Sequence, residues 1–256
     1  MITSTGNQQV KNLVQLKKKA KVRKEQNVFL AEGLKMFQEA PEDRIRQVYV
    51  SESFEREHGE ALLNHRYEVL ADFVFSYVSD TKTPQGVLCL VEQASWELKD
   101  LVEQPDPCLL VLENIQDPGN LGTMFRSAEG AGFSGVIMDG STADIYNPKT
   151  IRSTMGSIYR VPFVTAKDLP AAVLELKELG VRVYAAHLKG TCCYDEPDYK
   201  KASAFLIGNE GNGLTDQLAE LADEYVKIPM EGRLESLNAA VAASLFMYET
   251  NRQRRK

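Results

Sequence analysis

From about residue 108 to the end, the chain alternates short apolar runs with longer amphipathic stretches, and this rhythm restricts the fold more than any other feature. The apolar runs predict six strands, at 109–113, 135–138, 162–165, 181–186, 204–208 and 225–228. The stretches between them predict helices at 121–131, 149–158, 169–179 and 214–222, with a long last helix from about Ser236. Strands that alternate with helices form a parallel sheet covered on both faces, whose ligands bind beyond the carboxyl ends of the strands. The sequence therefore predicts an α/β fold with its site in the loops that follow the strands.

The first 95 residues have a different pattern and predict a smaller α/β domain. We expect helices at 8–26, 34–40 and 52–64 and strands at 28–31, 45–50 and 86–91. The polar stretch that follows has weak periodicity and is typical of a linker. We therefore predict a first domain at 1–95, a linker at 96–107 and a second domain at 108–256.

Composition excludes several classes of protein. With 43% hydrophobic and 26% charged residues among 256, the chain has the balance of a globular protein. The longest uncharged apolar run, 237–248, is shorter than the ~20 residues that span a bilayer, and the polar start lacks a secretion signal, so we expect a cytoplasmic location. The 4 cysteines have no CxxC spacing and are expected as reduced thiols. His187 near Cys192 and Cys193 lacks a second pair of ligands, so no metal is expected.

Positive charge is concentrated at the amino terminus, although the net charge is −6. Residues 1–24 contain no acid and hold the basic residues Lys11, Lys17, Lys18, Lys19, Lys21, Arg23 and Lys24. Such a run is often only a solvated helix face, but it is also the footprint of a protein that binds nucleic acid phosphates. The basic carboxyl terminus, with Arg252, Arg254, Arg255 and Lys256, would add to it.

The first of three distinctive loops joins a strand to a helix through Asp117-Pro118-Gly119-Asn120, and the helix carries Arg126. The ordinary interpretation is that Asn120 caps the helix and Arg126 pairs with Glu129.

The second loop follows a buried strand and brackets Glu210 with Gly208, Gly211 and Gly213. Glycines there let a backbone approach a ligand closely. The pattern is neither GxGxxG nor a phosphate loop, which disfavours nicotinamide cofactors and nucleoside triphosphates. Glu210 alone is equally compatible with a solvated turn.

The third loop runs from Ile228-Pro229-Met230 to Ser236-Leu237-Asn238, which opens the last helix. That helix is apolar on nearly all sides and should be buried on nearly all sides. The ordinary interpretation is that Ser236 is its N-cap.

Together and in this order, the three loops resemble the motifs of the SpoU-type (TrmH-like) RNA ribose 2′-O-methyltransferases of the SPOUT superfamily, over residues 108–250. Residues 3–33 resemble the substrate-binding domain of many members, which has the α/β fold of small RNA-binding ribosomal proteins. The resemblance implies a deep trefoil knot, a rare exception to the rule that chains do not thread. It also implies a homodimer with parts of both subunits at each site.

The resemblance also implies site residues. S-adenosylmethionine would contact Gly208, Ile228 and Leu237, with Ile207, Met230 and Ser236 in the same wall. The catalytic positions would be Arg126, Asn120, Glu210, Asn238 and Ser236. A guanidinium is a poor general base because its pKa exceeds ~12, so Arg126 would bind the adjacent phosphate and orient the 2′-hydroxyl or help to deprotonate it. Asn120 and Asn238 would hold Arg126 and the ribose, and Glu210 would orient donors in its loop.

The implied substrate is RNA, which its 2′-hydroxyl distinguishes from DNA. Besides Arg126, the expected RNA contacts are Lys17, Lys18, Lys19, Lys21, Arg23 and Lys24. Ribosomal RNA is the first choice and transfer RNA the alternative. A noncatalytic RNA-binding protein of the same fold remains open, and a nucleotide-dependent dehydrogenase is disfavoured because the glycine fingerprint is missing.

Overall fold

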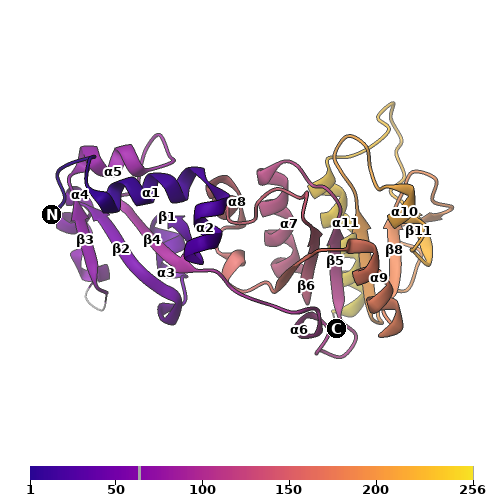
Figure 1. Cartoon of the computed structure of the whole chain (residues 1–256). Coiled ribbons are helices and arrows are strands. Elements are labelled where there is room, and N and C mark those ends of the chain that lie inside the picture. Colours follow the sequence, from indigo (N-terminus) through magenta and orange to yellow (C-terminus); the bar gives the residue numbers. More distant parts are fainter. Residues whose placement is uncertain (63–64, 256) are drawn as a thin grey trace. The chain divides into compact units, whose positions relative to one another are not determined.

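The structure, a computed structural model, describes residues 1–62 and 65–255. By its internal contacts the chain forms two compact units (Figure 1). The first unit contains Met1–Ala94 and Asp144–Tyr159, and the second contains Ser95–Ala143 and Arg160–Lys256. The chain therefore passes between the units three times.

The first unit is built on a four-stranded sheet in the order β1-β4-β2-β3. These strands are β1 (Val28–Glu32), β2 (Ile45–Ser51), β3 (Tyr67–Leu70) and β4 (Val87–Glu92). The β1–β4 and β4–β2 pairs are antiparallel, and β2–β3 is parallel. The strands predicted at 28–31, 45–50 and 86–91 are confirmed, and β3 is an addition.

Helices cover this sheet and bury one hydrophobic core. They are α1 (Gln8–Lys18), α2 (Ala20–Gln26), α3 (Leu34–Gln38), α4 (Glu52–His58) and α5 (Asp72–Val78), with short 3-10 turns at Glu42–Arg44 and Gly59–Leu62. Val10, Leu13 and Leu16 of α1 pack with Val74 and Phe75 of α5 in the core. Apolar residues at this spacing form one helix stripe, so each helix buries one face and leaves the other to solvent.

Two helix predictions for this unit are corrected. The helix expected at 8–26 is interrupted at Lys19, whose extended backbone (φ −124°, ψ 112°) separates α1 from α2. The helix expected at 52–64 ends at His58, and a 3-10 turn follows it; positions 63 and 64 lie outside the described residues.

The segment Asp144–Tyr159, which the sequence placed in the second domain, belongs by its contacts to the first unit. It contains α8 (Pro148–Thr154) and a 3-10 turn (Ser157–Tyr159). The ring of Tyr146 stacks on Phe29 with centroids 4.9 Å apart, and the Tyr159 hydroxyl donates to the Met36 carbonyl over 2.9 Å. Aromatic burial and hydrogen bonding therefore hold this segment on β1 and α3.

The second unit contains a parallel seven-stranded sheet in the order β7-β6-β5-β10-β8-β11-β9. The strands are β5 (Cys108–Leu112), β6 (Gly135–Asp139), β7 (Phe163–Ala166), β8 (Arg182–Ala186), β9 (Cys192–Cys193), β10 (Ser203–Ile207) and β11 (Glu224–Lys227). All six predicted strands are present, and β9 is an addition. The predicted α/β class with a parallel sheet is confirmed.

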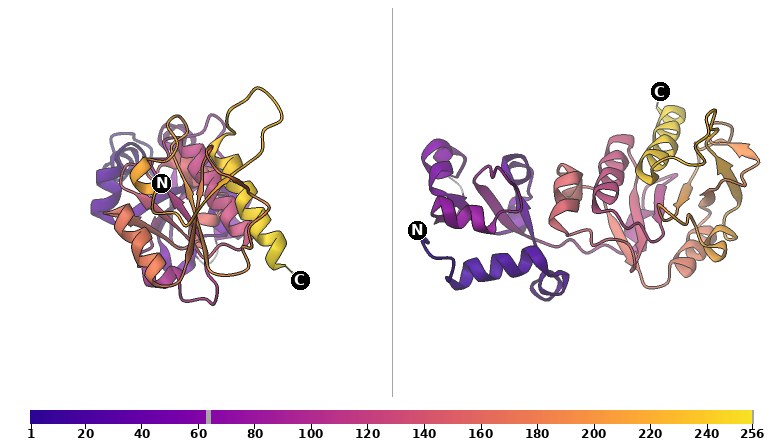
Figure 2. Two further views of the ribbon diagram at one scale, coloured as in Figure 1. Left: turned by 90° about the vertical axis from the view of Figure 1, so that its right-hand side faces the viewer. Right: turned by 90° about the horizontal axis from the view of Figure 1, so that it is seen from above.

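Helices lie on both faces of this sheet, with α9 on the side opposite α7 and α11 (Figure 2). They are α6 (Leu98–Leu101), α7 (Pro118–Ala131), α9 (Leu169–Glu178), α10 (Asp216–Ala219) and α11 (Ala239–Arg254). The last helix packs along α7, where the Ser127 and Ser244 hydroxyls are 2.8 Å apart and the Asn251 amide donates to the Ala131 carbonyl over 3.2 Å. The last helix thus returns to the first long helix of the same unit.

Among residues 1–62 and 65–255, no helix is long and apolar enough to span a membrane.

Candidate active site

Glu210 joins the loop after β10 to the loop after β5. Its carboxylate accepts hydrogen bonds of 3.0 Å from the backbone N–H groups of Gln116 and Asp117 and from the side-chain amide of Asn120. β10 and β5 are parallel neighbours, with Ile207 beside Leu112, so their following loops leave the same edge of the sheet. The first two motifs of the sequence therefore meet at one carboxylate.

Asn120 extends this contact to the third motif. Its Oδ1 accepts from Nδ2 of Asn238 over 3.0 Å. Asn238 in turn caps α11, because its Oδ1 accepts from the N–H groups of Ala240 (2.9 Å) and Val241 (3.2 Å). Glu210, Asn120 and Asn238 thus form one hydrogen-bonded chain, which we call the amide cluster, across three loops that are far apart in the sequence.

Two ordinary interpretations of these motifs are wrong. The N-cap of α7 is Asp117, whose carboxylate accepts from the N–H of Asn120 over 2.9 Å, so the Asn120 side chain is available for the cluster. The N-cap of α11 is Asn238, and the helix begins at Ala239 rather than near Ser236. Ser236 lies exposed in the loop before it.

The loop around Glu210 is held by a residue that the sequence analysis missed. Asn209 and Gly213 exchange backbone hydrogen bonds of 3.0 and 2.9 Å, and Oδ1 of Asn209 accepts from the N–H groups of Gly211 and Asn212. Its Nδ2 donates to the carbonyl of Asn114, at 2.8 Å. Asn209 opens the run Asn-Glu-Gly-Asn-Gly, and because asparagine and glycine are frequent turn residues, this composition could have identified the turn.

Gly208 is required by a close backbone approach. A Cβ atom at this position would lie 2.2 Å from the carbonyl carbon of Gly213 and from the nitrogen of Leu214. Any side chain here would push the two arms of the loop apart. The glycine therefore lets the loop close on itself directly after β10.

The charge of Glu210 is stabilised by the cluster. Burial raises the pKa of this carboxyl, but hydrogen bonds from Asn120, Gln116 and Asp117 outweigh burial and bring its pKa below the ordinary value. Glu210 is therefore ionised at neutral pH and serves as an anchor for donors, since a proton-transfer group works best with a pKa near the operating pH.

Arg126 is exposed on α7, outside the amide cluster. In the part of the chain that the structure describes, its guanidinium has no hydrogen bond or ion pair within the protein. Glu129, the expected partner, instead pairs with Arg160, whose Nη2 lies 3.2 Å from its carboxylate. The expected Arg126–Glu129 pair is therefore wrong, and the charge of Arg126 is uncommitted.

The residues expected to line the cofactor site lie at the same sheet edge. Ile207 and Gly208 are buried at the end of β10, and Ile228 is half-buried after β11. β10 and β11 both flank β8 in parallel register. Met230 and Leu237, on the loop toward Asn238, are also half-buried.

These residues fit a nucleoside-like group. Apolar side chains offer surface to an aromatic base, and the exposed backbone of the glycine loop offers donors and acceptors. Gly213, with φ +71°, has open space where its Cβ would be. Among the described residues, no group of three or more His, Cys, Asp or Glu side chains could hold a metal ion.

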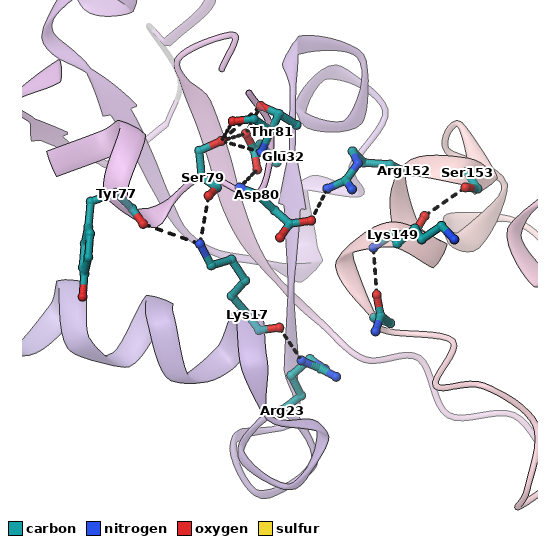
Figure 3. A network of polar contacts seen from close by, with 11 residues as sticks. Lys17, Arg23, Glu32, Tyr77, Ser79, Asp80, Thr81, Lys149, Arg152 and Ser153 are labelled. Atoms are coloured by element: carbon teal, nitrogen blue, oxygen red, sulfur yellow. Dashed lines mark hydrogen bonds and ion pairs between the residues drawn. The ribbon is translucent and has the colours of Figure 1, made fainter. Parts of the chain in front are cut away.

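The basic residues of the first unit divide into two classes. Lys18, Lys19, Lys21 and Lys24 are exposed. Lys17 is half-buried and its Nζ donates to the Ser79 carbonyl over 2.8 Å (Figure 3).

Arg23 is not available to RNA, which corrects the prediction. Its side chain is 4% exposed, bonds to the carbonyls of Leu16 and Lys17, and forms an ion pair with Asp144. Arg23 therefore fixes α2 to the segment Asp144–Tyr159.

Two of the carboxyl-terminal arginines, Arg252 and Arg254, are also engaged. Arg254 Nε donates to the Tyr199 carbonyl over 2.7 Å, and Arg252 pairs with Glu249 at 2.8 Å. These contacts hold α11 in place, and Arg254 is not a free charge.

Comparison with known proteins gives matches over nearly the whole chain. The SpoU rRNA Methylase family model matches residues 107–248, and the MRM3-like substrate binding domain matches residues 7–89. A Bacillus subtilis protein named 23S rRNA (guanosine(2553)-2′-O)-methyltransferase RlmP is 35% identical over 249 residues, 96% of this chain and 97% of its own.

Two solved structures are similar over the full length. An AdoMet-bound rRNA methyltransferase from Sinorhizobium meliloti has a TM-score of 0.88 and 32% identity, covering 100% of this chain and 98% of its own. The SpoU methyltransferase AviRb from Streptomyces viridochromogenes, in complex with AdoMet, has a TM-score of 0.88 and 29% identity, covering 97% and 98%.

Proposed function

The chain belongs to the SpoU rRNA methylase family, and from that premise we propose that it transfers a methyl group from S-adenosylmethionine to a ribose 2′-hydroxyl of ribosomal RNA. The observation that carries the proposal is the amide cluster, in which Glu210, Asn120 and Asn238 join the three motif loops. Ribosomal RNA is favoured over transfer RNA because a relative that matches almost end to end is named for 23S rRNA.

S-adenosylmethionine, when bound, supplies a methyl group activated by a sulfonium. We assign its contacts to Gly208, Ile228 and Leu237, with Ile207, Met230 and Ser236 in the same wall. The glycine backbone and the apolar side chains at this sheet edge support the assignment. The residues of the wall exclude water from one side of the reacting centre.

The amide cluster acts by positioning. The ionised carboxylate of Glu210 orients two backbone N–H groups and the amide of Asn120, and Asn120 holds Asn238 at the start of α11. Correct placement of a weak nucleophile contributes up to ~7–11 kcal/mol to barrier reduction. A cluster that fixes three loops at once serves this purpose.

Arg126 supplies the charge that meets the RNA. Its uncommitted guanidinium binds the phosphate beside the target ribose and orients the 2′-hydroxyl for attack. The cofactor, which Gly208, Ile228 and Leu237 would hold, would supply its methyl group to the 2′-oxygen and leave as S-adenosylhomocysteine, and the hydroxyl proton would pass to water. Ser236 lies exposed in the loop before α11, and we assign it a catalytic role beside its place in the cofactor wall.

We further propose a homodimer in the cytoplasm and a trefoil knot in the second unit. Val241 and Tyr248 on α11 are 49% and 51% exposed, and a second copy would cover this apolar surface. The return of α11 to α7 after the last long strand supports the knot. Sedimentation of a Val241→Asp variant tests the dimer, because a buried charge would separate the subunits.

Two measurements test the proposed activity. The purified protein is first titrated with S-adenosylmethionine by calorimetry, and absence of binding would favour a noncatalytic RNA-binding protein. Ribosomal and transfer RNA from cells that lack the gene are then incubated with protein and cofactor, and 2′-O-methyl positions are mapped. We expect one new position in ribosomal RNA; methylation of transfer RNA alone would move the assignment to the alternative substrate.

A further inference from the structure

Helix α5 exposes two large aromatic side chains on one face. Phe73 is 62% exposed and Tyr77 is 54% exposed, and residues four apart lie on the same side of a helix. The opposite face of α5 buries Val74, Phe75 and Val78 in the core. One face of α5 therefore packs in the hydrophobic core, and the other face exposes two aromatic rings to solvent.

The aromatic pair lies beside the basic helix α1. Nζ of Lys17 donates to the carbonyls of Tyr77 (3.5 Å) and Ser79 (2.8 Å), at the carboxyl end of α5 (Figure 3). Lys18 follows Lys17 on α1, and Lys11 lies two turns earlier on the same face as Lys18. Both of these lysines are exposed.

The acidic groups near this surface are hydrogen bonded, and one of them, Asp80, is compensated by a cation. Asp80 pairs with Arg152 at 2.7 Å, and Asp72 accepts from the backbone and hydroxyl of Ser53. Glu32 accepts from Ser79 and from the Thr81 hydroxyl (3.0 Å) (Figure 3). Asp72 and Glu32 have neutral partners and keep their negative charge, so the charges available to an RNA phosphate here are those of Lys11 and Lys18 on α1.

Exposed aromatic rings beside a row of cations are the arrangement by which proteins hold single-stranded nucleic acid. We propose that Phe73 and Tyr77 form a platform on which unpaired bases of the RNA substrate stack, while Lys11 and Lys18 hold the phosphates of the same strand. This inference rests on the proposed function and adds a recognition site far along the sequence from the methyl-transfer motifs. A second copy of the chain is a poorer occupant, because a symmetric contact would bring two lysine rows together.

The test measures binding of a fluorescein-labelled oligouridine of about 16 nucleotides, and of a duplex RNA of equal length, to the full chain. The variant Phe73→Ala with Tyr77→Ala should bind the single strand about five- to a hundredfold more weakly, with an unchanged salt dependence. The pair Phe73→Leu and Tyr77→Leu keeps apolar bulk without the aromatic faces and should lose as much. Phe73→Trp should keep binding, and its fluorescence should be quenched by the single strand.

Controls separate the platform from folding and from apolar docking. Leu174→Ala with Leu179→Ala removes two exposed apolar side chains from the second unit and should leave binding unchanged. The platform would be overturned if either double variant, with alanine or with leucine at positions 73 and 77, bound the single strand as tightly as the wild type. It would also be overturned if these variants lost self-association but kept their RNA affinity.

The experiments distinguish failure of the aromatic platform from failure of the proposed methyl-transfer activity. Wild-type protein that methylates ribosomal RNA, together with an alanine pair that binds RNA normally, removes the platform and leaves the activity. Wild-type protein that binds the single strand through these rings but transfers no methyl group removes the activity and leaves the platform.

Discussion

The amide cluster of the second unit and the basic helices of the first unit differ in how their polar groups are used. In the cluster, each of Glu210, Asn120 and Asn238 is bonded to residues far away in the sequence. On α1 and α2, by contrast, most of the lysines are exposed and point to solvent. We infer that the cluster acts through geometry, whose loss affects catalysis, and that the helices act through charge, whose loss affects RNA affinity and its salt dependence.

The largest expected effect belongs to Arg126. Arg126→Ala should lower methyl transfer by about a hundred- to a thousandfold, because the charge that orients the ribose is lost, as on removal of one preorganised donor from a reaction centre. Affinity for S-adenosylmethionine should stay within a few-fold of wild type, because Arg126 lies outside the cluster. Transfer is followed with radiolabelled cofactor and affinity by calorimetry, with Arg160→Ala as a matched arginine control on a neighbouring ion pair. Near-normal turnover would remove Arg126 from the site.

Arg23 belongs to the basic run at the amino terminus, but its contacts predict a structural role like that of the amide cluster. Arg23→Ala should lower the free energy of unfolding by about 3 kcal/mol, since the buried guanidinium pairs with Asp144 and its removal leaves that carboxylate unpaired. The salt dependence of RNA binding should not change. Urea unfolding measures the loss, and Lys24→Ala, one position away and exposed, should cost less than ~0.5 kcal/mol. Equal stability of the two variants would contradict the structural role of Arg23.

Glu210→Gln tests whether the amide cluster acts by positioning its loops. The variant should lower kcat/KM by about tenfold, because hydrogen bonds to a charged acceptor contribute ~1.5–3 kcal/mol and this site is partly exposed to solvent. Steady-state kinetics measure the effect, and Glu178→Gln on the exposed end of α9 is the control.

The same carboxylate sets a pH dependence. Because the hydrogen bonds of Glu210 outweigh burial and its folded pKa lies below the ordinary 4.5, it stabilises the fold above that value, and this stabilisation is lost as pH falls through the folded pKa. The stability difference between wild type and Glu210→Gln should therefore shrink below about pH 4.5. A difference that is constant down to about pH 3 would show that the charge is not stabilised by the cluster.

The smallest single effects belong to the exposed lysines. Each of Lys18→Ala, Lys19→Ala and Lys21→Ala should weaken RNA binding a few-fold and lower the salt slope by ~0.7–0.9 for each phosphate that the variant no longer neutralises. Affinity for S-adenosylmethionine should not change. Binding is measured across a salt series, with Lys200→Ala in the second unit as the control. An unchanged slope in the combined lysine variant would mean that α1 and α2 are only a solvated surface.

The sequence predicted the parallel sheet well because each of its strands is a continuous apolar run between turn residues, as in Ser203–Ile207 before Gly208. It predicted the convergence of the three loops only through the family resemblance. Periodicity cannot show that Asn238 reaches Asn120, since this contact depends on how the chain is threaded in space.

Other features depend on tertiary contacts that no local pattern contains. Arg23 and Lys24 are neighbours with similar local sequence, yet one is buried against Asp144 and the other is exposed. The cap of α7 was misassigned because Asp117 and Asn120 are both good N-cap residues, and only the contact of Asn120 with Glu210 decides between them.

The packing of Asp144–Tyr159 on the first unit limits how the molecule can be dissected. A fragment that ends at residue 95 would lack Tyr146 and Tyr159 and would expose the ring of Phe29 that they cover. A fragment that begins at residue 96 would carry the same segment without the surface on which it packs. Neither unit is a continuous stretch of the gene, so truncation at the apparent linker should give two poorly soluble products, and a separately folding first unit would need the segment grafted back onto it.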